Sequence, residues 1–177
     1  EKKGLPKERD LPDVVKAFEK MKAGGLALDG SESDKMIPFE MLTSLKLRPE
    51  DWKALAHTMS WTQLRMNLNT LQRHGVFEQK VMVEFVASRL RDAHSIKKAR
   101  CFPFQLLAAF KHVEYSMPTE ITLALQDAME IATENIPSFD LPGGIFVFPD
   151  ISGSMKSTPA TGVRKGATSK VTALDVA

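Results

Sequence analysis

The residues best suited to chemistry are one acid and two hydroxyls near the C-terminus. Asp150, Ser152 and Ser154 alternate along the chain directly after the apolar run 145–148. Side chains at alternate positions of such a loop can turn toward one point, and Gly153 allows a tight bend there. Carboxylate and hydroxyl oxygens are hard ligands that suit Mg²⁺. The pattern predicts a divalent-metal site at these three residues, with an ordinary Asp/Gly/Ser turn as the alternative.

Basic residues form a second group, concentrated in the middle of the chain. Residues 46–112 contain 12 Lys and Arg against 5 Asp and Glu, whereas the segments on both sides are net acidic. Cations near helix ends can neutralise the phosphates of a nucleic-acid backbone. They can also complement the dipoles of helix C-termini without any ligand, and the sequence leaves both readings open. The candidate phosphate-binding residues are Arg65, Arg73, His74, Lys97, Lys98, Arg100 and Lys111.

Other kinds of site find no support in the sequence. The four histidines fall in no zinc-binding spacing, and the single cysteine, Cys101, rules out an internal disulfide framework. Its apolar neighbours make Cys101 a core residue rather than a nucleophile. No group of residues resembles a catalytic apparatus, so we expect that the protein is not an enzyme. No apolar run approaches the roughly 18 residues that span a bilayer, and a chain with one cysteine fits the reducing cytoplasm.

Helical periodicity runs through most of the 177 residues, which are 43% hydrophobic and 26% charged. Successive helices joined by proline-marked turns predict an all-α fold of antiparallel pairs, stacked as a solenoid or an irregular bundle. The first predicted helix covers 12–22, and the next two begin at Pro38 and Pro49. A fourth runs from the Ser60/Gln63 capping box to Gly75, and a fifth covers 78–92. The last two begin at Pro103 and Pro118.

The period changes after the Pro-Gly-Gly sequence at 142–144. Residues 145–148 read as a buried β-strand, and 171–177 as the opening of a helix. A buried strand needs neighbours on both sides, and no second strand is predicted, so this last unit is expected to be incomplete. The predicted units are 1–36, a helix and a loop; 37–141, the helical domain; and 142–177, the start of an α/β domain.

Several motifs in order resemble the Ro RNA-binding proteins, specifically their bacterial members. They are MSWTQLRMNLNT at 59–70, RHGV at 73–76, KAR at 98–100 and PFQL at 103–106. The sequence DISGSM at 150–155 falls where that family begins its von Willebrand factor A-type domain, and it contains the Asp-x-Ser-x-Ser signature of a metal-ion-dependent adhesion site (MIDAS). The resemblance runs from about residue 37 to residue 177.

This resemblance implies the C-terminal part of a helical TROVE domain, built of HEAT-like repeats that close into a ring, followed by the start of the A-type domain. It also implies a ribonucleoprotein that binds small non-coding Y RNA and the single-stranded ends of misfolded RNA, in RNA quality control and with an exoribonuclease partner. Asp150, Ser152 and Ser154 would hold Mg²⁺ in the full-length protein. The alternative is a helical protein-interaction module with the metal site and no RNA role.

Overall fold

The computed structural model describes residues 11–23, 37–137, 143, 146–160 and 171–176. These residues form helices joined by short turns, and their β pairing is an isolated bridge between Pro159 and Thr172. The all-α expectation is therefore confirmed for the described residues. The α-helices are α1 (Asp13–Ala23), α3 (Phe39–Leu42), α4 (Pro49–Thr58), α5 (Trp61–Met66), α6 (Leu68–Arg73), α7 (Lys80–Leu90), α8 (Ala93–Lys98), α9 (Pro103–His112), α10 (Thr119–Ala132), α11 (Gly153–Ser157) and α12 (Ala173–Val176).

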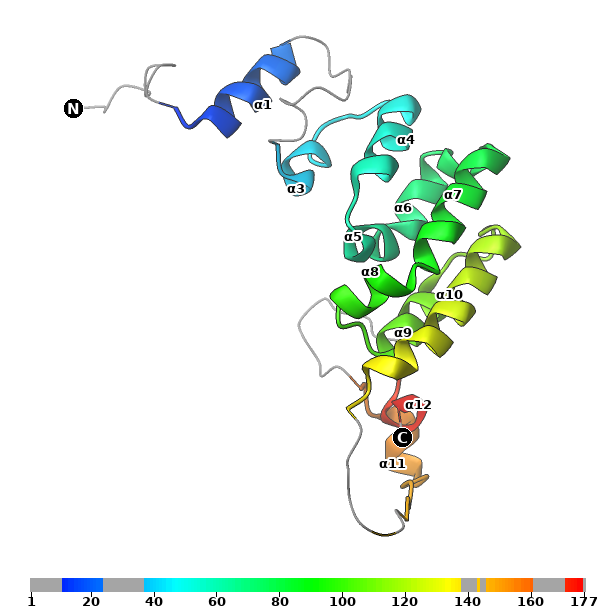
Figure 1. The fold of residues 1–177 in the computed structure, drawn as a ribbon. Coiled ribbons are helices and arrows are strands. Elements are labelled where there is room, and N and C mark those ends of the chain that lie inside the picture. Colours follow the sequence, from blue (N-terminus) through cyan, green and yellow to red (C-terminus); the bar gives the residue numbers. More distant parts are fainter. Residues whose placement is uncertain (1–10, 24–36, 138–142, 144–145, 161–170, 177) are drawn as a thin grey trace, which may run out of the picture.

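Helices α4 to α10 are stacked one beside the next, and α11 and α12 lie at the far end of this stack from α4 (Figure 1). Helix α10 packs against α7, α8 and α9. Alanines four residues apart on its inner face, Ala124, Ala128 and Ala132, are fully buried and let the neighbouring helices approach closely. The HEAT-like ring stays a prediction. The largest fully buried side chains of the stack are Leu64, Leu71, Leu90, Ile96, Leu106, Ile121 and Leu125.

Local signals set most helix starts as expected. The predicted capping box is present: the Ser60 N–H donates to Gln63 Oε1 at 2.9 Å, and the Gln63 N–H donates to Ser60 Oγ at 3.3 Å. At the start of α4 the Arg48 N–H donates to Asp51 Oδ2 at 3.0 Å, so the buried Asp51 carboxylate is satisfied by both backbone and guanidinium donors. Helices α4, α9 and α10 begin at or next to the predicted prolines.

The single helix predicted between Ser60 and Gly75 is wrong in one respect, because two helices occupy this segment. They meet at Asn67, whose φ of −109° is not helical. The Asn67 side chain donates to the Gln63 carbonyl at 2.8 Å and so competes with the backbone for that acceptor. The expected end at Gly75 is observed, and its φ of +71° explains why glycine stands there.

Helix α8 was not expected from periodicity, because it is only six residues long. Its start carries a signal nonetheless, since Asp92 accepts a hydrogen bond from the Ser95 N–H at 2.8 Å. In the segment before α8, predicted as one helix over 78–92, a 3₁₀ turn at Val76–Glu78 precedes α7.

The strand predicted at 145–148 is not seen. Ile145 lies outside the described residues, and Phe146, Val147 and Phe148 are 83%, 76% and 88% exposed. A buried strand depends on hydrogen bonds from neighbouring strands, and the described residues provide none. The helix predicted near the C-terminus is present as α12, beside the buried Val171. Within the described residues no helix has the length and apolar character needed to cross a membrane.

Candidate nucleic-acid interface

Three of the seven candidate basic residues gather at the C-terminal end of α8. Lys97 and Lys98 form its last turn, and Arg100 follows two residues later. All three are exposed, and none of the ion pairs in the described part of the chain involves them. We call Lys97, Lys98 and Arg100 the α8 cluster.

The backbone of the α8 cluster forms a Schellman motif. The Cys101 N–H donates to the Ile96 carbonyl at 3.4 Å, and the Arg100 N–H donates to the Lys97 carbonyl at 3.0 Å. This motif places Arg100 in the left-handed region, with φ of +49°. Glycine is the usual residue there, and a side chain costs about 1–2 kcal/mol. The protein therefore carries an exposed arginine at a position where glycine is more stable.

A residue outside the α8 cluster hydrogen-bonds one carbonyl in the last turn of α8 and one just after the helix. The Asn135 side-chain amide donates to the Ile96 carbonyl at 3.2 Å and to the Cys101 carbonyl at 2.8 Å. Cys101 is buried as predicted, and burial raises the pKa of its thiol. The α8 cluster is therefore not needed to hydrogen-bond these carbonyls, which weakens the reading that the cations serve only to complement a helix end.

Arg65 does not belong to the α8 cluster and is used within the fold. Its Nη1 donates to the Gln105 carbonyl at 2.9 Å, and its guanidinium lies 5.9 Å from the centre of the Trp61 ring. Its Nε is buried without a hydrogen-bond partner. These contacts join α5 to the first turn of α9.

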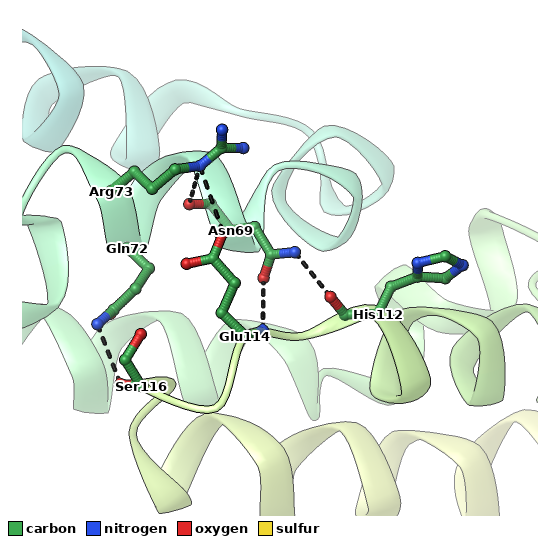
Figure 2. Close-up of polar contacts among 6 residues, drawn as sticks. All are labelled: Asn69, Gln72, Arg73, His112, Glu114 and Ser116. Carbon is green, nitrogen blue, oxygen red and sulfur yellow. Dashed lines mark hydrogen bonds and ion pairs between the residues drawn. The ribbon is translucent and has the colours of Figure 1, made fainter. Parts of the chain in front are cut away.

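Arg73 is likewise engaged, at the junction between α6 and the loop after α9 (Figure 2). Its Nε donates to the Asn69 carbonyl at 3.2 Å and lies 3.5 Å from Glu114 Oε1. The Asn69 side chain joins the same junction, because it donates to the His112 carbonyl at 2.8 Å and accepts from the Glu114 N–H at 3.0 Å. This junction caps the end of α9, and Arg73 is part of it.

The remaining two candidates also have partners. His74 is stacked on Trp52, with ring centroids 4.4 Å apart and planes 13° from parallel. The Lys111 ammonium donates to Asp175 of α12, and this bond is the main cause that lowers the pKa of Asp175 to about 2. Of the seven candidates, the structure thus brings together only the α8 cluster as exposed cations without an ion pair in the described residues.

The candidate metal-binding residues do lie together. Asp150 Oδ1 accepts from the Ser152 N–H at 2.9 Å, and the Ser152 and Ser154 hydroxyls are 2.9 Å apart. The bond from Ser152 lowers the pKa of Asp150 below its ordinary value, so the carboxylate is charged at neutral pH. These oxygens fit Mg²⁺ in type, but one loop with a single carboxylate supplies only part of an octahedral shell. No cluster of three or more His, Cys, Asp or Glu side chains occurs among the described residues.

Sequence reasoning missed the residues that support the α8 cluster. Asn135 lies 39 positions from the carbonyl that it binds, so no local pattern could reveal it. The left-handed backbone at Arg100 also carried no signal, because the sequence Lys-Lys-Ala-Arg-Cys at 97–101 lacks the glycine that usually marks such a position.

Comparison with known proteins identifies the family. No curated protein and no solved structure gives a significant match to the chain. The family model of the TROVE domain matches residues 32–138, which include α3 to α10 and all seven candidate basic residues. The chain therefore belongs to the TROVE domain family, the RNA-binding proteins of the Ro and telomerase-associated type.

Proposed function

We propose that this protein binds RNA through the α8 cluster, which contacts the phosphates of the RNA. The observation that carries the proposal is that Lys97, Lys98 and Arg100 are exposed together without a carboxylate partner among the described residues. Membership of the TROVE domain family supports RNA as the polyanion.

The proposed mechanism is electrostatic. Each lysine ammonium neutralises a phosphate as a point charge, and the Arg100 guanidinium can donate two parallel hydrogen bonds to one phosphate. Binding releases counterions from the RNA, so affinity falls steeply as salt concentration rises. Contacts of this kind position the RNA but do not read its sequence.

The finer assignments are proposals that follow from the Ro resemblance. We propose Y-like non-coding RNA and single-stranded ends of misfolded RNA as ligands, RNA quality control as the process, and an exoribonuclease as partner. A cytoplasmic location and the lack of enzymatic activity also stay predictions. Mg²⁺ at Asp150, Ser152 and Ser154 is a proposal that the converging oxygens support, and calorimetric titration of Mg²⁺ into wild type and Asp150→Ala tests it.

The RNA proposal is tested by removing the three charges. A labelled single-stranded RNA is titrated with wild type and with the triple variant Lys97→Gln, Lys98→Gln and Arg100→Gln over a salt series. We expect the slope of log affinity against log salt to become shallower by about 2, because each lost phosphate contact removes roughly 0.7.

A matched control separates a local site from a general effect of net charge. The triple variant Lys20→Gln, Lys46→Gln and Lys80→Gln removes the same charge from exposed residues elsewhere. It should leave the slope nearly unchanged. Equal loss in both triple variants, or RNA binding that does not depend on salt, would contradict the proposal and favour the protein-interaction module.

A further inference from the structure

A pocket of about 240 Å³ lies between the α5–α6 segment and the C-terminal half of α9. Its walls are mainly apolar, and polar side chains join them from both sides. The lining residues include Arg65, Met66, Leu68, Ala108, Ala109 and His112.

The size and the lining of this pocket suit a single small ring. Sites for drug-sized ligands measure roughly 300–1,000 Å³, so this one is smaller. Two alanines, Ala108 and Ala109, leave the space open on the α9 side. Met66 is 70% exposed, and its flexible thioether can adapt to the face of a ring.

Arg65 is the residue in this wall that most clearly calls for a ligand. Its guanidinium is held by the Gln105 carbonyl and by Trp61, yet its Nε has no partner. A buried donor without a partner is costly, and a small shift of the side chain on binding would relieve it. Guanidinium planes and histidine rings are also surfaces on which unpaired RNA bases stack.

The same arginine connects the pocket to the α8 cluster. Gln105, whose carbonyl it binds, lies in the first turn of α9. The charge of Arg65 also acts on the thiol of Cys101, the residue that follows Arg100. Gln105 follows Arg100 by five residues in the chain, so an RNA strand with phosphates at the α8 cluster can reach Arg65.

We propose that this pocket accepts one unpaired nucleobase of the RNA strand whose phosphates bind the α8 cluster. The inference rests on the proposed function and adds to it a means of selecting RNA. Phosphate contacts alone do not distinguish paired from unpaired RNA, whereas only an unpaired base is free to turn into a pocket. The pocket thus gives the protein a preference for single strands.

The test uses two single-stranded probes of equal length and charge. One is an ordinary RNA, and the other carries abasic ribose-phosphate units in place of nucleotides. Wild-type protein should bind the ordinary RNA roughly five- to 100-fold more tightly, the range expected for one stacked base. Ala108→Leu fills the pocket without changing charge and should abolish this difference, with the abasic affinity and its salt slope unchanged.

Controls keep the outcome decisive. Ala54→Leu makes the same substitution on α4, away from the pocket, and should leave the difference intact. Arg65→Lys keeps the charge but not the planar guanidinium, and it should reduce the difference several-fold even if Ala108→Leu fails to fold.

The outcomes also separate the pocket from the proposed function. If wild type binds both probes equally, the nucleobase pocket is overturned while phosphate binding stands. If Ala108→Leu weakens both probes by the same factor, the pocket is likewise overturned. If wild type binds neither probe, the proposed function fails as well.

Discussion

Helices α7 and α8 both end in cations, yet the structure uses the two groups differently. At the end of α7, Arg89 donates to the carbonyls of Ala56, His57 and Met59, at 3.4, 3.2 and 2.7 Å. Its neighbour Arg91 is paired with Asp127 of α10. At the end of α8 the lysines and Arg100 have no such partners in the described residues. The two groups look alike in the sequence, and only the fold separates structural cations from available ones.

The cations of α7 and α8 differ because different residues hydrogen-bond the carbonyls at nearby helix ends. Carbonyls at the end of α4 accept hydrogen bonds from Arg89, whereas Ile96 of α8 accepts one from Asn135 and His112 of α9 accepts one from Asn69. At α8, Lys97, Lys98 and Arg100 have no ion pair among the described residues, whereas Lys111 at the amide-capped end of α9 is paired with Asp175. A basic helix end is therefore a candidate ligand site when another residue caps it and its cations also have no carboxylate partner among the described residues.

The largest expected loss of stability follows substitution of Arg89. Arg89→Ala leaves three carbonyls without their charged donor and should lower the free energy of unfolding by about 2–3 kcal/mol, measured by urea denaturation. Arg91→Ala is the control, because its ion pair is partly exposed and should contribute less than about 1 kcal/mol. Equal losses at both positions would remove the distinction between capping and surface pairing.

The second-largest loss of stability is expected for a substitution of Asn135. Asn135→Ala removes two hydrogen bonds from the end of α8 and should cost about 1–2 kcal/mol in unfolding free energy. Because the backbone under the α8 cluster loosens, RNA affinity should fall as well. Asn135→Asp tests the same position with similar shape. Unchanged stability in Asn135→Ala would show that the amide does not cap α8.

Arg100→Gly should change stability and RNA affinity in opposite directions. Glycine suits the left-handed backbone, so the free energy of unfolding should rise by about 1 kcal/mol. RNA affinity should fall, because one guanidinium leaves the α8 cluster. Thermal denaturation and RNA titration on the same sample measure both. A variant that gains stability and keeps full RNA affinity would remove Arg100 from the proposed site.

The smallest effect concerns Lys111, which the fold pairs with an acid. The pKa of Asp175 is about 2 in the folded protein, below its ordinary 3.8, chiefly because of the hydrogen bond from Lys111. The contact therefore stabilises α12 fully above pH 4 and is lost as pH falls toward about 2. Amide chemical shifts of Thr172 and Asp175 should follow this titration, whereas Asp175→Asn should show no such change in this range.

Much of the helical body was predictable from the sequence, because its signals are local. Pro49, Pro103 and the Ser60/Gln63 capping box act within one turn of the helices that they begin. The break at Asn67 was not predictable from apolar spacing, since it depends on a side chain that competes with the backbone. The strand at 145–148 was predicted from an apolar run, but the side chains of Phe146, Val147 and Phe148 are exposed in the structure.

The candidate site was predictable only as a set of charges. Composition identified the basic middle, and the resemblance gave RNA as its ligand. Whether a cation has a partner depends on residues far away in the sequence. Arg91, for example, is paired with Asp127, which lies 36 positions further along the chain. The sequence therefore predicted seven phosphate-binding residues, and three of them form the α8 cluster.

The Schellman motif and the Asn135 amide together have a consequence for the thermodynamics of binding. They fix the backbone on both sides of the α8 cluster before any ligand arrives. Ordering one backbone residue costs about 1–2 kcal/mol, and here that entropy is lost during folding rather than during association. Association then has to immobilise only three side chains, which is how a small preorganised surface can hold a flexible polymer.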